Sequence, residues 1–123
     1  MKEEIEINGK KYVLASSIKS SVKAPTKKGL TYCIVRTYSA GVFAGYCDKA
    51  TKGKEMIILN ARRIWYWTGA NSLSQLAIDG TKTPDTCKFT APVSEVILKE
   101  VIELIPCTKK AMDNILEVAI WQK

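Results

Sequence analysis

Alternating hydrophobic and polar residues open the chain and predict β-structure. Residues 4–7 alternate with a period of two, and residues 11–14 follow in a second extended run after Asn8 and Gly9. Because Asn-Gly supplies the two positive-φ positions of a tight turn, this segment is predicted to form a hairpin.

A run of β-branched and aromatic residues over 30–67 predicts the central sheet. Turn residues at 39–41 and a polar loop at 48–54 divide the run into three strands. The third strand, 55–67, carries a predicted bulge near residues 60–61. Three consecutive antiparallel strands are the simplest arrangement.

Two short helices are predicted in the second half of the chain. Ser72 and Gln75 have the spacing of a capping box, and Gly80 ends the first helix. Thr108 is the predicted N-cap of the second, C-terminal helix. The apolar face of the first helix comprises Leu73, Leu76 and Ala77, and that of the second Met112, Ile115, Leu116 and Ala119.

The segment 93–105 is compatible with two structures. Its Val and Ile residues fit a helical stripe, but their density also fits a buried strand, and Pro106 ends either one. We favour the strand. The chain is therefore predicted to be a single domain, residues 1–123, of the α+β class: a small antiparallel β-sheet with a few short helices, including a C-terminal helix.

Composition agrees with a globular domain. Of the 123 residues, 46% are hydrophobic and 25% are charged. No apolar run approaches the roughly 20 residues that cross a bilayer, so we expect no membrane contact. The start, Met1-Lys2-Glu3-Glu4, lacks the layout of a signal peptide, and a cytoplasmic location is expected.

Charge and residue usage narrow the chemistry. The chain has no histidine, which excludes Ser-His-Asp or Cys-His relays and histidine-ligated metals within it. Four widely spaced cysteines without a CxxC pair predict reduced, buried thiols, and no acidic cluster suggests a metal site. Nineteen Lys and Arg against twelve Asp and Glu leave a net charge of +7, which favours anionic partners.

The segment 60–67 is the densest cluster of candidate binding residues. Since side chains alternate along a strand, Arg63, Trp65 and Trp67 are expected to share one face with Ile57 and Leu59, while Arg62 lies on the other. Arginine suits phosphate oxygens, and tryptophan offers a flat surface to a base. The alternative is that the tryptophans belong to the core and Arg63 stacks on them.

Polar residues elsewhere could also meet an anion. Arg36 stands between Val35 and Thr37 in a strand expected to be well covered, so it must pair with a carboxylate or with a ligand phosphate. Asn71 stands just before the Ser72 cap, and Lys109 and Lys110 stand at the start of the C-terminal helix, where free backbone N–H groups attract anions. For the lysines we favour simple solvation.

Unusual motifs run through most of the chain from residue 30 onward. They are residues 36–43 (RTYSAGVF), 60–73 (NARRIWYWTGANSL), 87–89 (CKF), 91–93 (APV) and 105–108 (IPCT). Through these motifs, which lie within residues 30–123, the sequence resembles a family of phage and prophage proteins, the Thoeris anti-defence sponges, which sequester cyclic ADP-ribose signals.

The resemblance implies a non-catalytic binding protein without a cofactor. Such proteins capture glycocyclic ADP-ribose made by TIR-domain immune enzymes in the bacterial host cytoplasm, which blocks anti-phage defence. They form homo-oligomers built from dimers with the ligand between protomers, and some hold cyclic oligonucleotides at a second site. Carried over to this chain, ligand contacts are expected from Arg36, Asn71 and Lys88, with Phe43, Phe89 and Trp67 as stacking candidates and Arg62 or Arg63 as further cations.

Two other functions fit the same residues. The Arg and Trp side chains could bind single-stranded nucleic acid in an open groove, or the basic surface could dock an acidic protein. An open groove over several phosphates predicts a steep dependence of affinity on salt, whereas a closed pocket for two phosphates predicts a shallow one.

Overall fold

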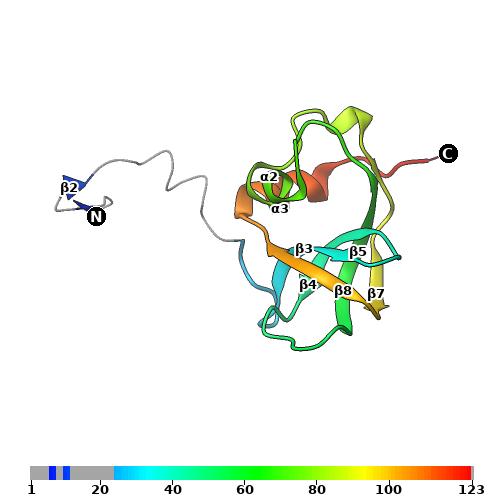
Figure 1. Cartoon of the computed structure of the whole chain (residues 1–123). Helices are drawn as coiled ribbons and strands as arrows, with labels where there is room; N and C mark the ends of the chain where they lie inside the picture. Colours follow the sequence, from blue (N-terminus) through cyan, green and yellow to red (C-terminus); the bar gives the residue numbers. More distant parts are fainter. Residues whose placement is uncertain (1–5, 8–9, 12–23, 123) are drawn as a thin grey trace.

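The computed structural model describes residues 6–7, 10–11 and 24–122. β1 (Glu6–Ile7) pairs antiparallel with β2 (Lys10–Lys11), as the opening hairpin predicts, while its turn at 8–9 lies outside the described residues. The other elements are β3 (Thr31–Thr37), β4 (Val42–Cys47), β5 (Met56–Tyr66), α2 (Leu73–Asp79), the 3₁₀ turn η1 (Pro84–Thr86), β6 (Lys88–Phe89), β7 (Val93–Leu98), β8 (Val101–Pro106) and α3 (Lys109–Glu117). The predicted α+β class is confirmed (Figure 1).

The six main strands form one antiparallel sheet that curls on itself. β3, β4 and β5 are consecutive neighbours, as predicted; β8 pairs with β3, and both β6 and β7 pair with β5. Only Lys99 and Glu100 separate β7 from β8, although these two strands pair on opposite sides of the central β4. A link of two residues can join them only because the sheet bends until its two edges approach each other (Figure 1).

The ambiguous segment 93–105 forms strands, as favoured, but two of them rather than one. β7 ends at Leu98, and β8 begins at Val101, whose backbone N–H donates to the carbonyl of Lys54 at 2.9 Å. The apolar pattern continues across the bend because both strands face the same interior. Periodicity alone therefore did not locate the break.

The concave face of the sheet encloses one apolar cluster. All five long strands contribute to it: Cys33 and Val35, Phe43 and Cys47, Met56, Ile58 and Ala61, Leu98, and the partly buried Val96, Val101 and Leu104. Because the curled sheet surrounds this cluster, no helix is needed to cover it.

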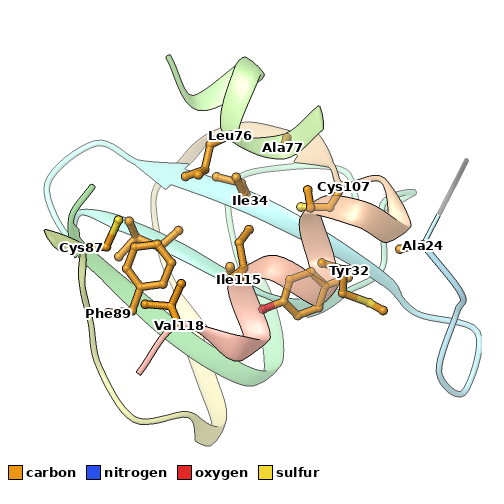
Figure 2. Packing of buried hydrophobic residues seen from close by; sticks show 14 residues of the cluster. Ala24, Tyr32, Ile34, Leu76, Ala77, Cys87, Phe89, Cys107, Ile115 and Val118 are labelled. Atoms are coloured by element: carbon orange, nitrogen blue, oxygen red, sulfur yellow. The ribbon is translucent and has the colours of Figure 1, made fainter. Parts of the chain in front are cut away.

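The convex face packs against the two helices. Tyr32, Ile34, Ala44 and Ile64 of the sheet contact Leu76 and Ala77 of α2, Ala111, Met112 and Ile115 of α3, and Phe89 of β6. Figure 2 shows Leu76 and Ile34 facing each other across this layer, with Ile115 beside them. The two layers together account for the α+β architecture.

A bulge in β5 reverses the alternation of faces for the side chains that follow it. Asn60 has a φ of 53°, and the pairing with β4 shifts between Ala44 and Tyr46, as the predicted bulge requires. A Cβ on Gly45 would lie 2.4 Å from Cγ2 of Ile58, so only glycine fits opposite the bulge.

The predicted face of Arg63 is wrong for this reason. Leu59 pairs with Tyr46 and Arg62 with Ala44, so Leu59 shares the convex face with Arg62. Arg63 pairs with Phe43 and shares the concave side with Ile58 instead. The extra residue shifts the period of two, which strict alternation does not allow for.

Both helices begin at their predicted caps. The Ser72 hydroxyl accepts from the Gln75 N–H at 3.1 Å, and the Thr108 hydroxyl accepts from the Ala111 N–H at 3.1 Å. Gly80 ends α2 with a φ of 77°. The predicted apolar face of α3 is partly wrong: Leu116 lies on an exposed side of the helix, and Ala119 lies beyond the end of the helix at Glu117 and is also exposed.

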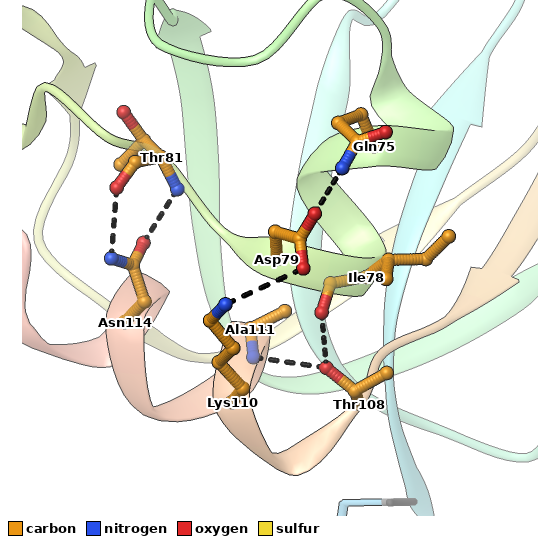
Figure 3. Close-up of polar contacts among 8 residues, drawn as sticks. All are labelled: Gln75, Ile78, Asp79, Thr81, Thr108, Lys110, Ala111 and Asn114. Atoms are coloured by element: carbon orange, nitrogen blue, oxygen red, sulfur yellow. Dashed lines mark hydrogen bonds and ion pairs between the residues drawn. The ribbon is translucent and has the colours of Figure 1, made fainter. Parts of the chain in front are cut away.

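Polar bonds lock α2 to α3 (Figure 3). The Thr108 hydroxyl donates to the carbonyl of Ile78 at 2.6 Å, so the cap of one helix also holds the end of the other. Asn114 and Thr81 exchange two bonds, of 2.9 and 3.0 Å. This junction leaves no room for a side chain at Gly80, whose Cβ would lie 2.5 Å from Asn114.

The remaining observations concern the cysteines, membrane-spanning helices and metal sites. All four cysteines are buried and free, as predicted. Within the described ranges, no helix is long and apolar enough to cross a membrane. The same part of the chain contains no group of three or more Cys, Asp or Glu side chains that could hold a metal ion.

Candidate ligand-binding surface

Three of the eight expected site residues lie in the interior. Phe43 is in the concave cluster, and Phe89 is in the convex one with none of its surface exposed. The Arg62 side chain is also buried, with 1% of its surface exposed. None of these side chains is open to a ligand in the single chain, so we leave them out of the candidate surface.

Arg62 is held entirely by backbone carbonyls. Its guanidinium donates to the carbonyls of Thr90 at 2.7 Å, Ile115 at 2.8 Å and Val118 at 2.7 Å, with longer bonds to Phe89 and Ala119 at 3.3 and 3.5 Å. The Ile115 carbonyl lies in the last turn of α3 and the Val118 carbonyl at its C-cap, where the helix dipole favours a cation. Burial lowers the pKa of the guanidinium, but the carbonyls satisfy its donors. Arg62 thus anchors the C-terminal segment to the sheet.

Arg36 lies on the surface, contrary to the expectation of a covered strand. It stands one residue before the end of β3, beyond the residues that α2 and α3 cover. Its Nε donates to Oε1 of Glu103 at 2.9 Å, and 47% of its side chain is exposed. Of the two partners expected for Arg36, the structure shows the carboxylate, in a pair open to solvent.

Arg63 is exposed beside a cavity of about 270 Å³. Its Nη1 donates to the carbonyl of Ala40 at 2.7 Å, and its guanidinium lies 4.5 Å from the centre of the Phe43 ring. These two contacts fix the side chain over the ring. The cavity is lined by residues 39–42 together with Arg63, Ile64 and Trp65.

Trp65, which also lines this cavity, lies close to Trp121 of the C-terminal segment. Trp65 is 62% exposed, and the centre of its ring lies 5.7 Å from that of the Trp121 ring. The backbone N–H of Trp121 donates to the carbonyl of Phe89 at 2.9 Å, which places the C-terminal segment beside β6. The ammonium group of Lys88 lies 5.3 Å from the Trp121 ring and 5.7 Å from the Tyr66 ring.

These residues form one continuous surface, which we call the Trp65 surface: Arg63, Trp65, Tyr66, Lys88 and Trp121. It combines two cations with three flat rings, and the adjoining cavity has no carboxylate in its lining. Such a surface can neutralise phosphate oxygens and stack a planar base.

The remaining expected residues lie elsewhere. Trp67 follows the end of β5 and packs against the convex cluster, where its indole N–H donates to the carbonyl of Ala70 at 3.3 Å. It does not share the face of Arg63, which is a second consequence of irregular pairing, here between Ile64 and Tyr66. Asn71 is exposed, immediately before the cap of α2.

The two exposed arginines point to opposite sides of the sheet. Arg36 pairs with Val42 and Arg63 with Phe43, and successive residues of a strand face opposite ways. Sequence reasoning did not separate them, and it also did not include Trp121 or Tyr66 in the site. Their proximity to Lys88 depends on how the C-terminal segment returns to β6, for which the sequence gives no local signal.

Fold and surface together define a small α+β domain with an exposed cationic and aromatic surface on its sheet. Residues 30–115 match the family model described as a domain of unknown function, DUF6948, and the chain belongs to that family. No curated protein and no solved structure matches the chain.

Proposed function

We propose that this protein is a non-catalytic sponge that binds and sequesters a cyclic ADP-ribose signal, glycocyclic ADP-ribose, and so blocks Thoeris anti-phage defence in the bacterial host cytoplasm. The observation that carries the proposal is the Trp65 surface, on which Arg63 and the exposed Trp65 line an open cavity and Lys88 lies against the rings of Tyr66 and Trp121. A cyclic ADP-ribose presents two phosphates and one base, which match two cations and one stacking ring.

Arg63 and Trp65, the two residues of the surface that line the cavity, are suited to binding rather than to proton transfer. Arginine remains protonated at any physiological pH, and tryptophan does not titrate. A sponge needs affinity without turnover, and nanomolar affinity corresponds to about −12 kcal/mol. Charge-assisted hydrogen bonds in a site shielded from water can contribute much of it.

The binding site is proposed to be shared between two copies of the chain. Because Arg36 and Arg63 project from opposite faces, one chain cannot direct both at one small ligand. A second copy that brings its Arg36 and Asn71 to the Trp65 surface would close the site. Exposed Trp65, Tyr66 and Ile120 supply the apolar contact that such a dimer requires.

Native mass spectrometry of the protein mixed with the products of a TIR-domain enzyme tests the proposal. We expect an oligomer that gains the mass of the signal, and we expect heat to release the signal unchanged. Trp65→Ala should remove this gain, whereas Lys82→Gln, which changes an exposed lysine between α2 and η1, should not. Release of a cleaved product would show an enzyme, and binding of single-stranded DNA in preference to the signal would show a nucleic-acid binder.

A further inference from the structure

A second cavity, of about 300 Å³, lies on β5 away from the Trp65 surface. It is formed where the turn at 27–30 meets the β5 bulge, and its lining includes Lys27, Lys28, Tyr46, Asn60 and Ser94. Asn60 precedes Trp65 by five residues, about 17 Å along a strand. The cavity is therefore separate from the Trp65 surface.

The backbone is unusual at this cavity. Among the described residues, Lys28 and Asn60 are the only residues other than glycine with positive φ, at 55° and 53°. Both line the same cavity, although they are far apart in the sequence. Left-handed backbone at residues with a Cβ is disfavoured by about 1–2 kcal/mol and gathers at binding sites.

The fold stabilises the left-handed backbone at both Lys28 and Asn60. Lys27 and Leu30 exchange two backbone hydrogen bonds, of 3.0 and 2.9 Å, which close a tight turn around Lys28. Gly45 permits the bulge at Asn60. As a result, two polar side chains from different elements face one space, as a preformed site requires.

The side chains of this cavity suit an anion. Lys27 and Lys28 bring two ammonium groups, Ser94 a hydroxyl and Asn60 an amide, and every charged lining residue is cationic. The Lys27 ammonium lies 5.5 Å from the centre of the Tyr46 ring, which restricts its position. Two cations and two neutral donors match the charge and the oxygens of a phosphate dianion better than those of a single carboxylate.

We propose that this cavity, the Lys27–Asn60 cavity, binds the phosphate group of a small phosphate monoester. Its volume is at the lower end of ligand sites, so it accepts the phosphate and a compact attached group rather than a large nucleotide. The site operates independently of the Trp65 surface.

Titration of the full chain with phenyl phosphate, followed by the NMR signals of the Asn60 side-chain amide and the Ser94 backbone amide, tests the proposal. We expect saturable shifts at both residues. Lys27→Gln with Lys28→Gln should weaken binding at least tenfold. The matched pair Lys82→Gln with Lys109→Gln removes the same charge from the helical side and should change the affinity by less than twofold.

Two further variants and a second ligand show what the site recognises. Asn60→Asp keeps a residue that tolerates left-handed backbone but places a carboxylate in the cavity, and it should abolish binding. Trp65→Ala should leave binding unchanged, which separates this site from the proposed signal site. Equal weakening by both lysine pairs, shifts that spare Asn60 and Ser94, or equally tight binding of the monoanion phenyl sulfate would overturn the proposal.

Discussion

At the residue scale, the neighbouring Arg62 and Arg63 differ in burial and in their contacts. Arg62 is buried and donates to five backbone carbonyls, whereas Arg63 is exposed and lies over a phenyl ring. The alternation of the strand places one on each side of the sheet, and only one side is covered by α3. The same residue type therefore holds the fold at one position and presents a cation to solvent at the next.

Replacing Arg62 should destabilise the fold. Arg62→Met leaves buried carbonyls of β6 and α3 without donors, and we expect the free energy of unfolding to fall by about 3 kcal/mol. Arg63→Met, at an exposed position, should lower it by less than about 1 kcal/mol. Chemical denaturation of both variants measures the difference, and equal losses would contradict a structural role for Arg62.

Burial of the Cys107 thiol makes the stability of the fold depend on alkaline pH. Burial raises the pKa of the Cys107 thiol to about 12, while an unfolded cysteine has a pKa of about 8.5. The folded state therefore keeps a proton that the unfolded state loses, and stability falls as the pH rises through this window. Between pH 7 and pH 9.5 we expect the loss from Cys107 to be about 1.4 kcal/mol.

Cys107→Ala provides the comparison for this prediction. The variant should be less stable at pH 7 because it leaves a small cavity, but its stability should fall less between pH 7 and pH 9.5. Denaturant unfolding at both values measures the two slopes. Parallel slopes for the two proteins would mean that Cys107 does not cause the alkaline loss.

At the element scale, the bulge of β5 sets which residues reach the surface. Its extra residue, Asn60, moves Leu59 to the face of Arg62 and leaves Arg63 and Trp65 to follow a new register. The close approach of β4 and β5 depends on glycine at position 45, because there is no space there for a methyl group beside Ile58. The bulge thus connects a local backbone feature to the composition of both cavities.

Gly45→Ala tests this dependence. The added Cβ would meet Cγ2 of Ile58 at 2.4 Å and the Leu59 carbonyl oxygen at 2.9 Å, and we expect a loss of about 1–3 kcal/mol in the free energy of unfolding. Gly53→Ala is the control, since nothing lies within 4 Å of its Cβ and only its φ of 86° opposes alanine. Thermal unfolding should rank Gly45→Ala as the less stable variant. The reverse order would show that the strands can separate at the bulge without penalty.

At the scale of the whole molecule, the exposed arginines face opposite ways while large apolar side chains remain uncovered. A dimer explains both features if each copy completes the other's site. With two-fold symmetry, every dimer then has two equal sites, each containing Arg36 of one copy and Trp65 of the other.

Mixing two inactive variants tests the shared site. Arg36→Ala and Trp65→Ala should each lose the signal, and each should keep its fold because both side chains are exposed. Random exchange between them makes half of the dimers mixed, with one intact site in each, so about a quarter of the capacity should return. Calorimetry before and after mixing measures the recovered binding capacity. A mixture that stays inactive would place all contacts within one chain.

Several elements could be predicted from sequence because their signals are local. The caps at Ser72 and Thr108 and the stop at Gly80 depend on residues within a few positions of each other. The strands at 31–37 and 42–47 follow from β-branched residues and a turn between them. The candidate site was harder, since Phe43, Arg62 and Phe89 have the right chemistry but contact the protein itself.

The sequence by itself determined the α+β class, the caps of both helices, the positive charge and the exclusion of histidine chemistry. The tertiary structure alone decided which face each residue of β5 occupies, that Arg62 binds the end of α3, and that Lys88 lies against the rings of both Tyr66 and Trp121. Caps, turns and periodicity arise from neighbours in the chain. A bulge, the curl of a sheet and the return of a terminal segment are set by contacts between residues distant in sequence, which local patterns do not encode.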